Sequence, residues 1–245
     1  MTSPCPPAPA PRVTAVVVTY NRRQLLMESL AALAAQTRPA QDVIVVDNAS
    51  TDETAAAVRE HFPRVRLTRL TRNTGGAGGF AYGMALALAG GTDLGGTDPG
   101  GTDLGGTDPG GTDLIWLMDD DTVPEPGALA ALLDARARHQ GGSRPPALLA
   151  SRVVWTDGRP HPMNTPRVKP FASRAERQAA AAAGCVPVRS ASFVSVLLDA
   201  GVCAQRGLPL ADYFLWNDDF EFTTRLLRGN AGLLCPASLV VHKTA

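Results

Sequence analysis

Three consecutive aspartates, Asp119, Asp120 and Asp121, follow a short apolar run at residues 114–118. The run has the length and composition of a buried strand. Neighbouring carboxylates at its end repel one another and lose hydration, so a cation must offset them. Oxygen ligands suit a divalent metal ion, and ligands bind beyond the carboxyl ends of strands in open α/β sheets. The pattern therefore predicts a metal and nucleotide site. The alternative is an exposed acidic turn that caps the next helix.

Polar side chains also follow two earlier strand-like segments of the chain. They are Thr19, Tyr20, Asn21 and Arg22 after residues 13–18, and Asp47 with Asn48 after residues 43–46. Polar groups at these places can meet a nucleotide at the edge of a sheet. The Asp47 carboxylate can accept the imide N–H of a uracil or thymine. A plain helix cap and an Asx turn are the structural alternatives for the two segments.

A glycine-rich segment, residues 73–79, follows a third strand-like run at residues 65–70. Glycines let the backbone approach a phosphate or a sugar closely, which makes Asn73 and Gly76 candidate nucleotide-binding residues. The segment superficially resembles the dinucleotide-binding fingerprint. That fingerprint belongs after the first strand, with an acidic residue about 20 positions later. A nicotinamide cofactor is therefore disfavoured.

Two further features near the end of the chain could take part in chemistry. Asp218, Asp219 and Glu221 lie at the start of a predicted helix, where the helix dipole favours acidic side chains. One of them could instead serve as a general base. His242 ends a short strand at residues 239–241, and a lone histidine is most often structural. Beside Asp121 it would complete an oxygen and imidazole site for Mn²⁺ or Mg²⁺.

The elements that must position these residues alternate between strands and helices, which predicts an α/β fold with a mostly parallel central sheet and right-handed crossovers. The predicted strands are residues 13–18, 43–46, 65–70, 114–118, 147–155, 192–198 and 239–241. The predicted helices are residues 24–36, a segment ending near 61, and residues 79–89, 125–139, 174–183 and 218–228. Ser50 and Glu53 have the spacing of a capping box for the second helix.

Composition excludes several classes of protein. The 23 basic and 23 acidic residues cancel, so no basic surplus supports nucleic-acid binding. The four cysteines are scattered without a C-x-x-C pair, which disfavours a zinc site or a disulfide framework. Residues 1–11 are proline-rich and predict a disordered tail. No run reaches the roughly 18 apolar residues of a membrane span. We expect a cytoplasmic protein that could also bind peripherally to the inner face of the cell membrane.

Residues 90–114 are five copies of Gly-Gly-Thr-Asp followed by Leu or Pro. This composition cannot bury a core, so residues 90–113 are predicted to be a flexible loop. A tandem expansion in a tolerant surface loop explains it most simply. The aspartates of the repeat are evenly spaced and do not converge, which disfavours a metal site there.

The order of these motifs resembles glycosyltransferase family two. The motifs are Val-Thr-Tyr-Asn-Arg, Val-Val-Asp-Asn-Ala-Ser-Thr-Asp, Asn-x-Gly-Gly-Ala-Gly-Gly, Trp-Leu-Met-Asp-Asp-Asp, Trp-x-Asp-Asp-x-Glu and a final His. The resemblance implies one GT-A domain over residues 12–245 and an inverting, metal-dependent transfer from a nucleotide sugar. It implies that Thr19, Asn21, Asp47 and Asn73 line the nucleotide, with Tyr20, Arg22, Gly76 and Asp120 as further candidates.

The same resemblance assigns roles around the reacting centre. Asp119 would contact ribose and metal, while Asp121 and His242 would bind the metal. Asp219 would be the base, supported by Asp218 and Glu221. Trp216 could stack on the acceptor sugar.

The closest subgroup is the galactofuranosyltransferase-like and rhamnosyltransferase-like enzymes, which implies a UDP- or dTDP-sugar donor and a glycan or lipid-linked acceptor in cell-surface polysaccharide synthesis. The chain ends three residues after His242, where relatives usually carry further helices, so we expect a C-terminally short domain. A truncated relative that binds nucleotide sugar without turnover is therefore one alternative. A haloacid-dehalogenase-like phosphatase is another, since Asp119-x-Asp121 fits its start. That fold needs its aspartate strand first, and here the strand comes fourth.

Overall fold

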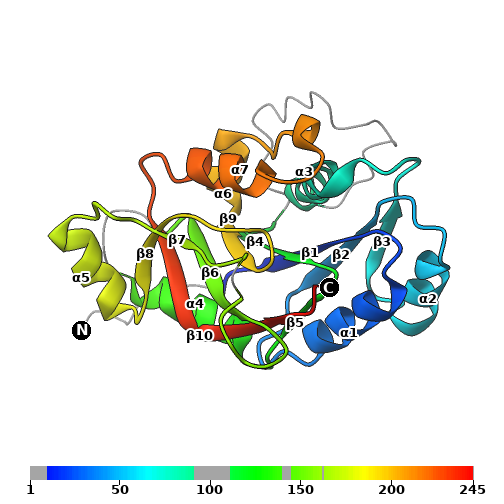
Figure 1. Cartoon of the computed structure of the whole chain (residues 1–245), viewed down its shortest axis with the longest axis horizontal. Coiled ribbons are helices and arrows are strands. Elements are labelled where there is room, and N and C mark those ends of the chain that lie inside the picture. The colour runs from blue at the N-terminus through cyan, green and yellow to red at the C-terminus, as the bar shows by residue number, and fades with distance from the viewer. Residues whose placement is uncertain (1–9, 91–110, 140–144, 162, 245) are drawn as a thin grey trace, which may run out of the picture.

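A computed structural model describes residues 10–90, 111–139, 145–161 and 163–244 of the chain. The predicted tail lies almost wholly outside these residues, as do the first four copies of the repeat apart from Gly90. Within the described residues, ten strands form one sheet with helices on both of its faces (Figure 1). The α/β class predicted from the alternation of strands and helices is confirmed.

The strands follow the order β3-β2-β1-β4-β9-β6-β10-β8-β7, and β5 pairs with β10. The pairings from β3 to β4 are parallel, as is that of β6 with β10, whereas β9 runs antiparallel between β4 and β6. The strands are β1 (Val13–Thr19), β2 (Asp42–Asp47), β3 (Arg66–Arg69), β4 (Leu114–Asp119), β5 (Thr122–Pro124), β6 (Leu148–Val154), β7 (Arg167–Val168), β8 (Val186–Ser190), β9 (Val196–Asp199) and β10 (Gly232–His242).

Helices cover the two faces of the sheet and enclose separate hydrophobic clusters. One face carries α1 (Arg23–Ala34), α2 (Thr54–His61) and α4 (Ala128–Arg138) (Figure 1). The other face carries α3 (Gly75–Leu88), α6 (Ala200–Arg206) and α7 (Asp218–Leu226). The remaining helix, α5 (Arg174–Ala182), lies beside β8. Successive side chains of β1 alternate between the faces: Val17 belongs to the first cluster and Val16 to the second. Every residue of β1 is buried for this reason.

The glycine-rich segment differs from its prediction. The helix was expected to begin at Gly79, but α3 begins at Gly75, so most of the expected glycine loop is helical. A Cβ atom at Gly79 or Gly83 would lie 2.4 Å from a methyl group of Val18 or Val16. These two glycines therefore let α3 approach the sheet, and they pack against strand side chains rather than presenting backbone to a ligand.

The predicted capping box at Ser50 and Glu53 is wrong. Glu53 adopts a left-handed conformation ahead of α2, and Asp52 accepts hydrogen bonds from the Thr54 N–H and hydroxyl instead. The Ser50 hydroxyl accepts the Asn21 N–H, which ties the loop after β2 to the loop after β1. A true capping box occurs at Ser173, which caps α5.

Five short elements were not predicted: β5, β7, β8, α6 and a 3-10 turn at Ala211–Tyr213. The strand expected at residues 192–198 is confined to β9, and α6 follows it directly. The strand expected at residues 239–241 is the end of the eleven-residue β10. β5 and β10 pair antiparallel, with His242 opposite Thr122. This pairing brings the C-terminal end of β10 to the aspartates after β4.

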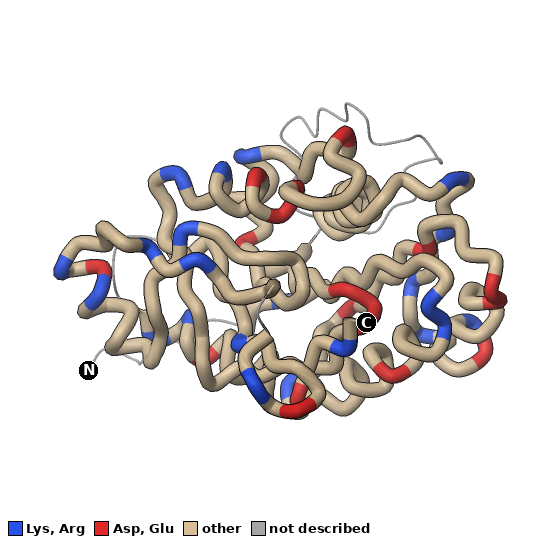
Figure 2. Tube along the Cα trace, in the orientation of Figure 1, with Lys and Arg blue, Asp and Glu red and all other residues tan. Residues whose placement is uncertain are grey.

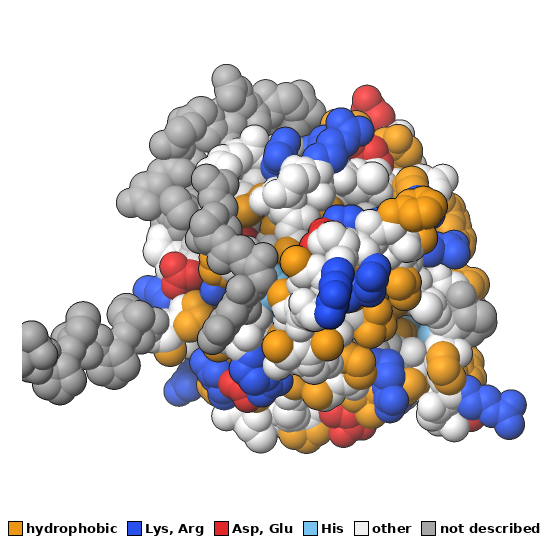
Figure 3. All heavy atoms as spheres, turned by 90° about the vertical axis from the view of Figure 1, so that its left-hand side faces the viewer, with side chains coloured by type: hydrophobic (Ala, Val, Ile, Leu, Met, Phe, Trp, Pro, Cys, Tyr) orange, Lys and Arg blue, Asp and Glu red, His pale blue; other side chains and the backbone are white. Residues whose placement is uncertain are grey.

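Among the described residues, no helix combines the length and apolarity needed to span a membrane. On the face shown in Figure 3, Lys and Arg side chains are spread among apolar and polar ones.

Deletion of residues 90–109 should change the free energy of unfolding by no more than about 1 kcal/mol, because loop length enters closure entropy logarithmically. The copy that stays is attached to the sheet: the Thr112 hydroxyl lies 2.8 Å from that of Thr14, and Asp113 accepts the Arg12 N–H. Urea unfolding of the deleted and full chains measures the difference. A loss of several kcal/mol would contradict the tandem-expansion hypothesis.

Candidate active site

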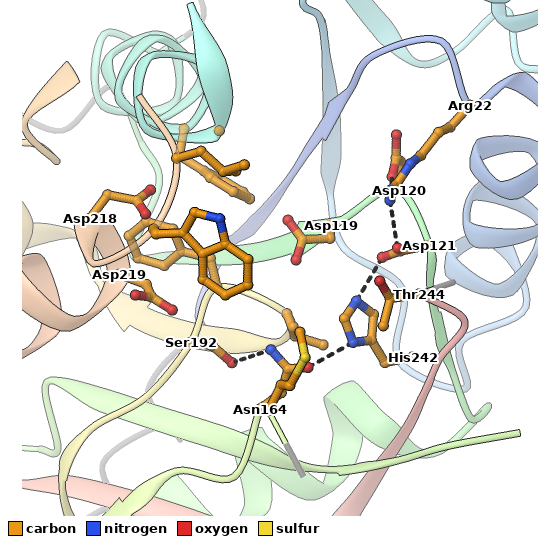
Figure 4. Close-up of a pocket in the computed structure, with 17 residues that line it drawn as sticks. Arg22, Asp119, Asp120, Asp121, Asn164, Ser192, Asp218, Asp219, His242 and Thr244 are labelled. Atoms are coloured by element: carbon orange, nitrogen blue, oxygen red, sulfur yellow. Dashed lines mark hydrogen bonds and ion pairs between the residues drawn. The ribbon is translucent and has the colours of Figure 1, made fainter. Parts of the chain in front are cut away.

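A pocket of about 290 Å³ lies where β4 ends, beside the start of α7 and the end of β10. Residues from several segments that are distant in sequence line it (Figure 4). They include Arg22, Gly76, Asp119, Asp120, Asp121, Asn164, Ser192, Trp216, Asp218, Asp219 and His242. The predicted metal-binding and base residues therefore share one pocket.

Asp119, Asp121 and His242 form a compact group of potential metal ligands. One ligand atom from each residue lies within 4.8 Å of the others. His242 Nε2 is 2.8 Å from an Asp121 carboxylate oxygen (Figure 4). Figure 2 shows the acidic segment beside the C-terminal end of the chain. The pairing of β5 with β10 creates this proximity, because it places His242 next to the turn that carries the aspartates.

Asn164 sets the orientation of the His242 ring. Its amide oxygen is 2.9 Å from His242 Nδ1, and its amide nitrogen donates to the Ser192 hydroxyl at 3.5 Å. With Nδ1 bonded to Asn164, Nε2 is the ring nitrogen that faces Asp121 and could bind a metal ion. Such a bond behind a histidine is what orients imidazole ligands in metal sites.

The charges in the group favour a bound cation. Desolvation and the neighbouring Asp121 charge raise the pKa of Asp119 to about 7. Burial would also raise the pKa of Asp121, but His242 and Arg22 hold it below its ordinary value. The Arg22 guanidinium contacts Asp121 at 2.6 Å and Asp120 at 3.4 Å. The Arg22 guanidinium and the His242 ring thus face three carboxylates. Two carboxylates and an imidazole suit Mn²⁺ or Mg²⁺, so these residues fit the implied metal.

Two of the three acidic residues at the start of α7 face the pocket. Burial and the Asp219 charge raise the pKa of Asp218 to about 6, and burial also raises the pKa of Asp219. Glu221 instead forms a two-bond ion pair with Arg225, at 2.7 and 3.0 Å, and is not among the residues that line the pocket. Arg225 in turn donates to the Leu208 carbonyl. Glu221 therefore fastens the preceding loop to α7.

Several residues predicted to line the nucleotide hydrogen-bond to loop backbone in this structure. Asp47 is fully buried and accepts the N–H of Ser50, three residues on in its own loop. Asn21 accepts the Thr51 N–H, and Asn73 accepts the Gly75 N–H. Thr19 is buried, while Tyr20 is largely exposed. These five residues lie at or after the ends of β1, β2 and β3, beside the pocket rather than in its lining, and their nucleotide contacts stay a prediction.

Sequence reasoning missed Asn164, Ser192 and Met163, which line the pocket from loops. The proline-rich stretch around Asn164 was interpreted only as a long loop. The one signal that the sequence offers is the position of His161 and Asn164 between prolines, which hold loop residues in place. Phe193 and Phe80, whose rings lie 4.8 Å apart, also line the pocket and come from segments that were predicted as a strand and a helix.

The family model for glycosyl transferase family 2 matches residues 14–89, which run from β1 to the end of α3. The chain carries a family 2 glycosyltransferase domain. It is 30% identical over 221 residues to galactofuranosyltransferase GlfT1 of Mycobacterium tuberculosis, covering 88% of this chain and 64% of that protein. It is 38% identical over 128 residues to GlfT1 of Mycolicibacterium smegmatis, covering 52% and 36%. The chain thus spans less than two thirds of these relatives.

Solved structures confirm the predicted GT-A fold of this family 2 domain. Residues 1–349 of S. aureus TarS in complex with UDP match with a TM-score of 0.67 at 16% identity, over 96% of this chain and 61% of that one. Mannosyltransferase PcManGT from Pyrobaculum calidifontis, in complex with GDP-Man and Mn²⁺, matches with a TM-score of 0.59 at 21% identity, over 98% and 59%. The resemblance drawn from the ordered motifs is confirmed for family and fold.

Proposed function

We propose that this protein is an inverting, metal-dependent glycosyltransferase that moves a sugar from a nucleotide-diphosphate sugar to a glycan or lipid-linked acceptor. One observation carries the proposal: a metal-ligand group and a pair of carboxylates with raised pKa values line one pocket. Figure 4 shows the pair, Asp218 and Asp219, across the pocket from His242 and Asp121. Inversion by one displacement needs the base and the leaving group on opposite sides of the sugar.

On the donor side, Asp119, Asp121 and His242 would hold the metal, and Asp120 would stay paired with Arg22. A bound Mn²⁺ or Mg²⁺ would supply positive charge to the departing diphosphate. Arg22 lines the same pocket with nearly half of its side chain exposed, so its guanidinium can also reach a phosphate. Asn164 would keep the His242 ring turned toward this group.

On the acceptor side, Asp219 would accept the proton of the acceptor hydroxyl as its oxygen bonds to the anomeric carbon. The bond from that carbon to the diphosphate oxygen breaks in the same step, and no covalent enzyme intermediate forms. Asp218 supports Asp219 electrostatically, since each carboxylate disfavours a second negative charge beside it. The exposed Trp216 indole offers a stacking surface for the acceptor sugar.

The sugar class is proposed from the relatives. Two of them are named galactofuranosyltransferases, which supports a UDP-galactofuranose donor, with dTDP-rhamnose as the related choice, in cell-surface polysaccharide synthesis. We place this reaction in the cytoplasm, at the inner face of the membrane, where a nucleotide sugar and a lipid-linked acceptor can meet. The GT-A fold leaves the phosphatase alternative without support, because that enzyme requires a different fold.

A donor screen followed by a product assay tests the proposal. Ligands that bind only the folded state raise the melting temperature, so UDP, dTDP and their sugars should do so in the presence of Mn²⁺ and much less with a chelator. Product formation then separates a transferase from a non-catalytic relative. A chain that binds no nucleotide sugar with either metal would overturn the proposal; one that binds without transfer would support the non-catalytic alternative.

The raised pKa values at the start of α7 predict an acid limb in the pH profile. A base must be deprotonated, and the Asp218 carboxyl has a pKa of about 6, with that of Asp219 shifted in the same direction. We expect kcat/KM to fall with decreasing pH, as Asp218 takes up a proton near pH 6 and as Asp219 takes one up above the ordinary range of an aspartate. Rates at saturating Mn²⁺ between pH 5 and 8 measure it. A profile that is flat down to pH 5 would contradict raised pKa values at this pair of carboxylates.

A further inference from the structure

The segment of residues 214–217 joins the wall of the pocket to α7. Leu215 and Trp216 line the pocket and are 58% and 66% exposed, although both are large and apolar. Asp218 and Asp219 follow directly. The position of this segment therefore determines where the indole and the two carboxylates stand relative to the metal-ligand group.

The backbone of this segment is strained. Phe214, Trp216 and Asn217 have φ angles of 57°, 72° and 63°. A bulky residue in the left-handed region is an outlier, whereas asparagine adopts this region more readily. Phe214 and Trp216 therefore keep this conformation only where surrounding contacts hold them.

The holding contact comes from the start of α3. The Phe214 carbonyl accepts the Ala77 N–H at 3.1 Å, which satisfies one of the free donors in the first turn of that helix. Gly75 lies directly beneath this carbonyl. A Cβ atom on Gly75 would lie 2.0 Å from the Phe214 oxygen and 2.5 Å from its carbonyl carbon. These are backbone atoms, so a side chain at residue 75 would push the segment away.

Asn48 fixes Gly75 in turn. Its buried amide donates to the Gly75 carbonyl at 2.7 Å, and its oxygen accepts the N–H and the hydroxyl of Thr74 at 2.8 and 3.1 Å. Gly75 itself has a φ of 71°, which a glycine adopts without cost. A continuous set of contacts thus runs from the end of β2, through the start of α3, to the segment of residues 214–217.

We propose that Gly75 and Asn48 are positioning residues for the acceptor side of the reaction. They seat the Phe214 carbonyl and thereby place Trp216 and Asp219. The acceptor role of those two residues rests on the proposed function; the seating itself rests on the contacts above. Gly75, which belongs to the glycine-rich segment, thus lies against a protein backbone, whereas Gly76, the candidate named from that segment, lines the pocket.

Gly75→Ala is the direct test, and Gly184→Ala is its matched control. Gly184 ends α5 with a φ of 72°, and no atom lies within 4 Å of a Cβ built there. Both variants therefore carry the same left-handed strain, but only Gly75→Ala collides with Phe214. We expect Gly75→Ala to lose roughly 10²-fold in kcat/KM for the acceptor, as small misplacements of reacting groups do. The Kd for UDP with Mn²⁺ should stay within about twofold of the Gly184→Ala value.

Amide hydrogen exchange supplies a readout that does not require activity. In Gly75→Ala the Ala77 N–H should lose protection that Gly184→Ala retains, because its acceptor has moved. Acrylamide quenching of Trp216 should rise as well. These measurements distinguish a failure of this inference from a failure of the proposed function. They report the position of the Phe214 carbonyl even in a parent protein that has no transfer activity.

Asn48→Ala tests the same contacts without adding an atom, should Gly75→Ala not fold. We expect a smaller loss in the same direction, with donor binding retained. Parental acceptor kinetics together with parental Ala77 protection in either folded variant would overturn the inference. Equal loss of donor and acceptor binding would also overturn it, since Gly75 would then act on the nucleotide side.

Discussion

Asp121→Ala should abolish Mn²⁺-dependent nucleotide-sugar binding, with a loss of at least about 100-fold in affinity. The substitution removes one carboxylate from the group that contains Asp119 and His242, and it takes away the oxygen that lies 2.8 Å from the His242 ring. The fold should remain largely intact, because the change also relieves repulsion among three adjacent carboxylates. Calorimetric titration of the donor nucleotide, with Mn²⁺ and with a chelator, measures the effect.

Asp157→Ala is the control for Asp121→Ala, since it removes an exposed carboxylate that does not line the pocket. It should bind donor and metal as the parent does. Circular dichroism and melting temperature verify that both variants fold. Unchanged metal-dependent affinity in Asp121→Ala would remove this residue from the metal site and leave Asp119 and His242 without their third ligand.

Asp219→Asn should retain donor binding and lose transfer by a factor of about 10² to 10⁴, the usual contribution of a general base. An asparagine keeps the size of the side chain, and its amide oxygen can still accept the Phe220 N–H that Asp219 accepts at 2.6 Å. It cannot take a proton. Asp218→Asn should lose less, because it removes only the neighbouring charge that raises the energy of a second carboxylate.

Asp212→Asn is the matched control for the base, since it makes the same chemical change on the exposed turn just before the segment of residues 214–217. It should transfer at the parental rate. Single-turnover rates with saturating donor separate the chemical step from binding. Near-parental transfer by Asp219→Asn would move the role to Asp218, the other acidic residue at the start of α7 that lines the pocket.

The sequence predicted the scaffold well where hydrophobic patterning decides the structure. The β-branched runs became β1 and β2, and the apolar run before Asp119 became β4, because strands covered on both faces must be apolar throughout. Since parallel strands end at the same edge, the place of the aspartates followed from these runs. The three-residue β5 is too short to show a pattern, and Pro187 interrupts that of β8.

The polar residues of the loops were harder to interpret from sequence. Asp47, Asn48 and Asn73 have the chemistry of nucleotide ligands, yet Asp47 and Asn73 hydrogen-bond to backbone groups of their own loops and Asn48 bonds to the start of α3. The same side chains serve either purpose, and only the distances between loops decide. Asn164 was missed for the same reason. The role of Asn164 depends on its distance to His242, and no local sequence pattern encodes that distance.

The pairing of β5 with β10 also has a consequence for the order in which the protein assembles. The two aspartates lie near the middle of the described chain and the histidine near its C-terminal end, and they meet through this long-range pairing. Contacts between distant residues form late, because the entropy of closing the intervening chain opposes them. A partly folded chain with β1 to β4 in place would therefore hold Mn²⁺ weakly. Tight metal binding during refolding would then report that β10 has paired with β5. The ion would stabilise the finished fold and would not direct its formation.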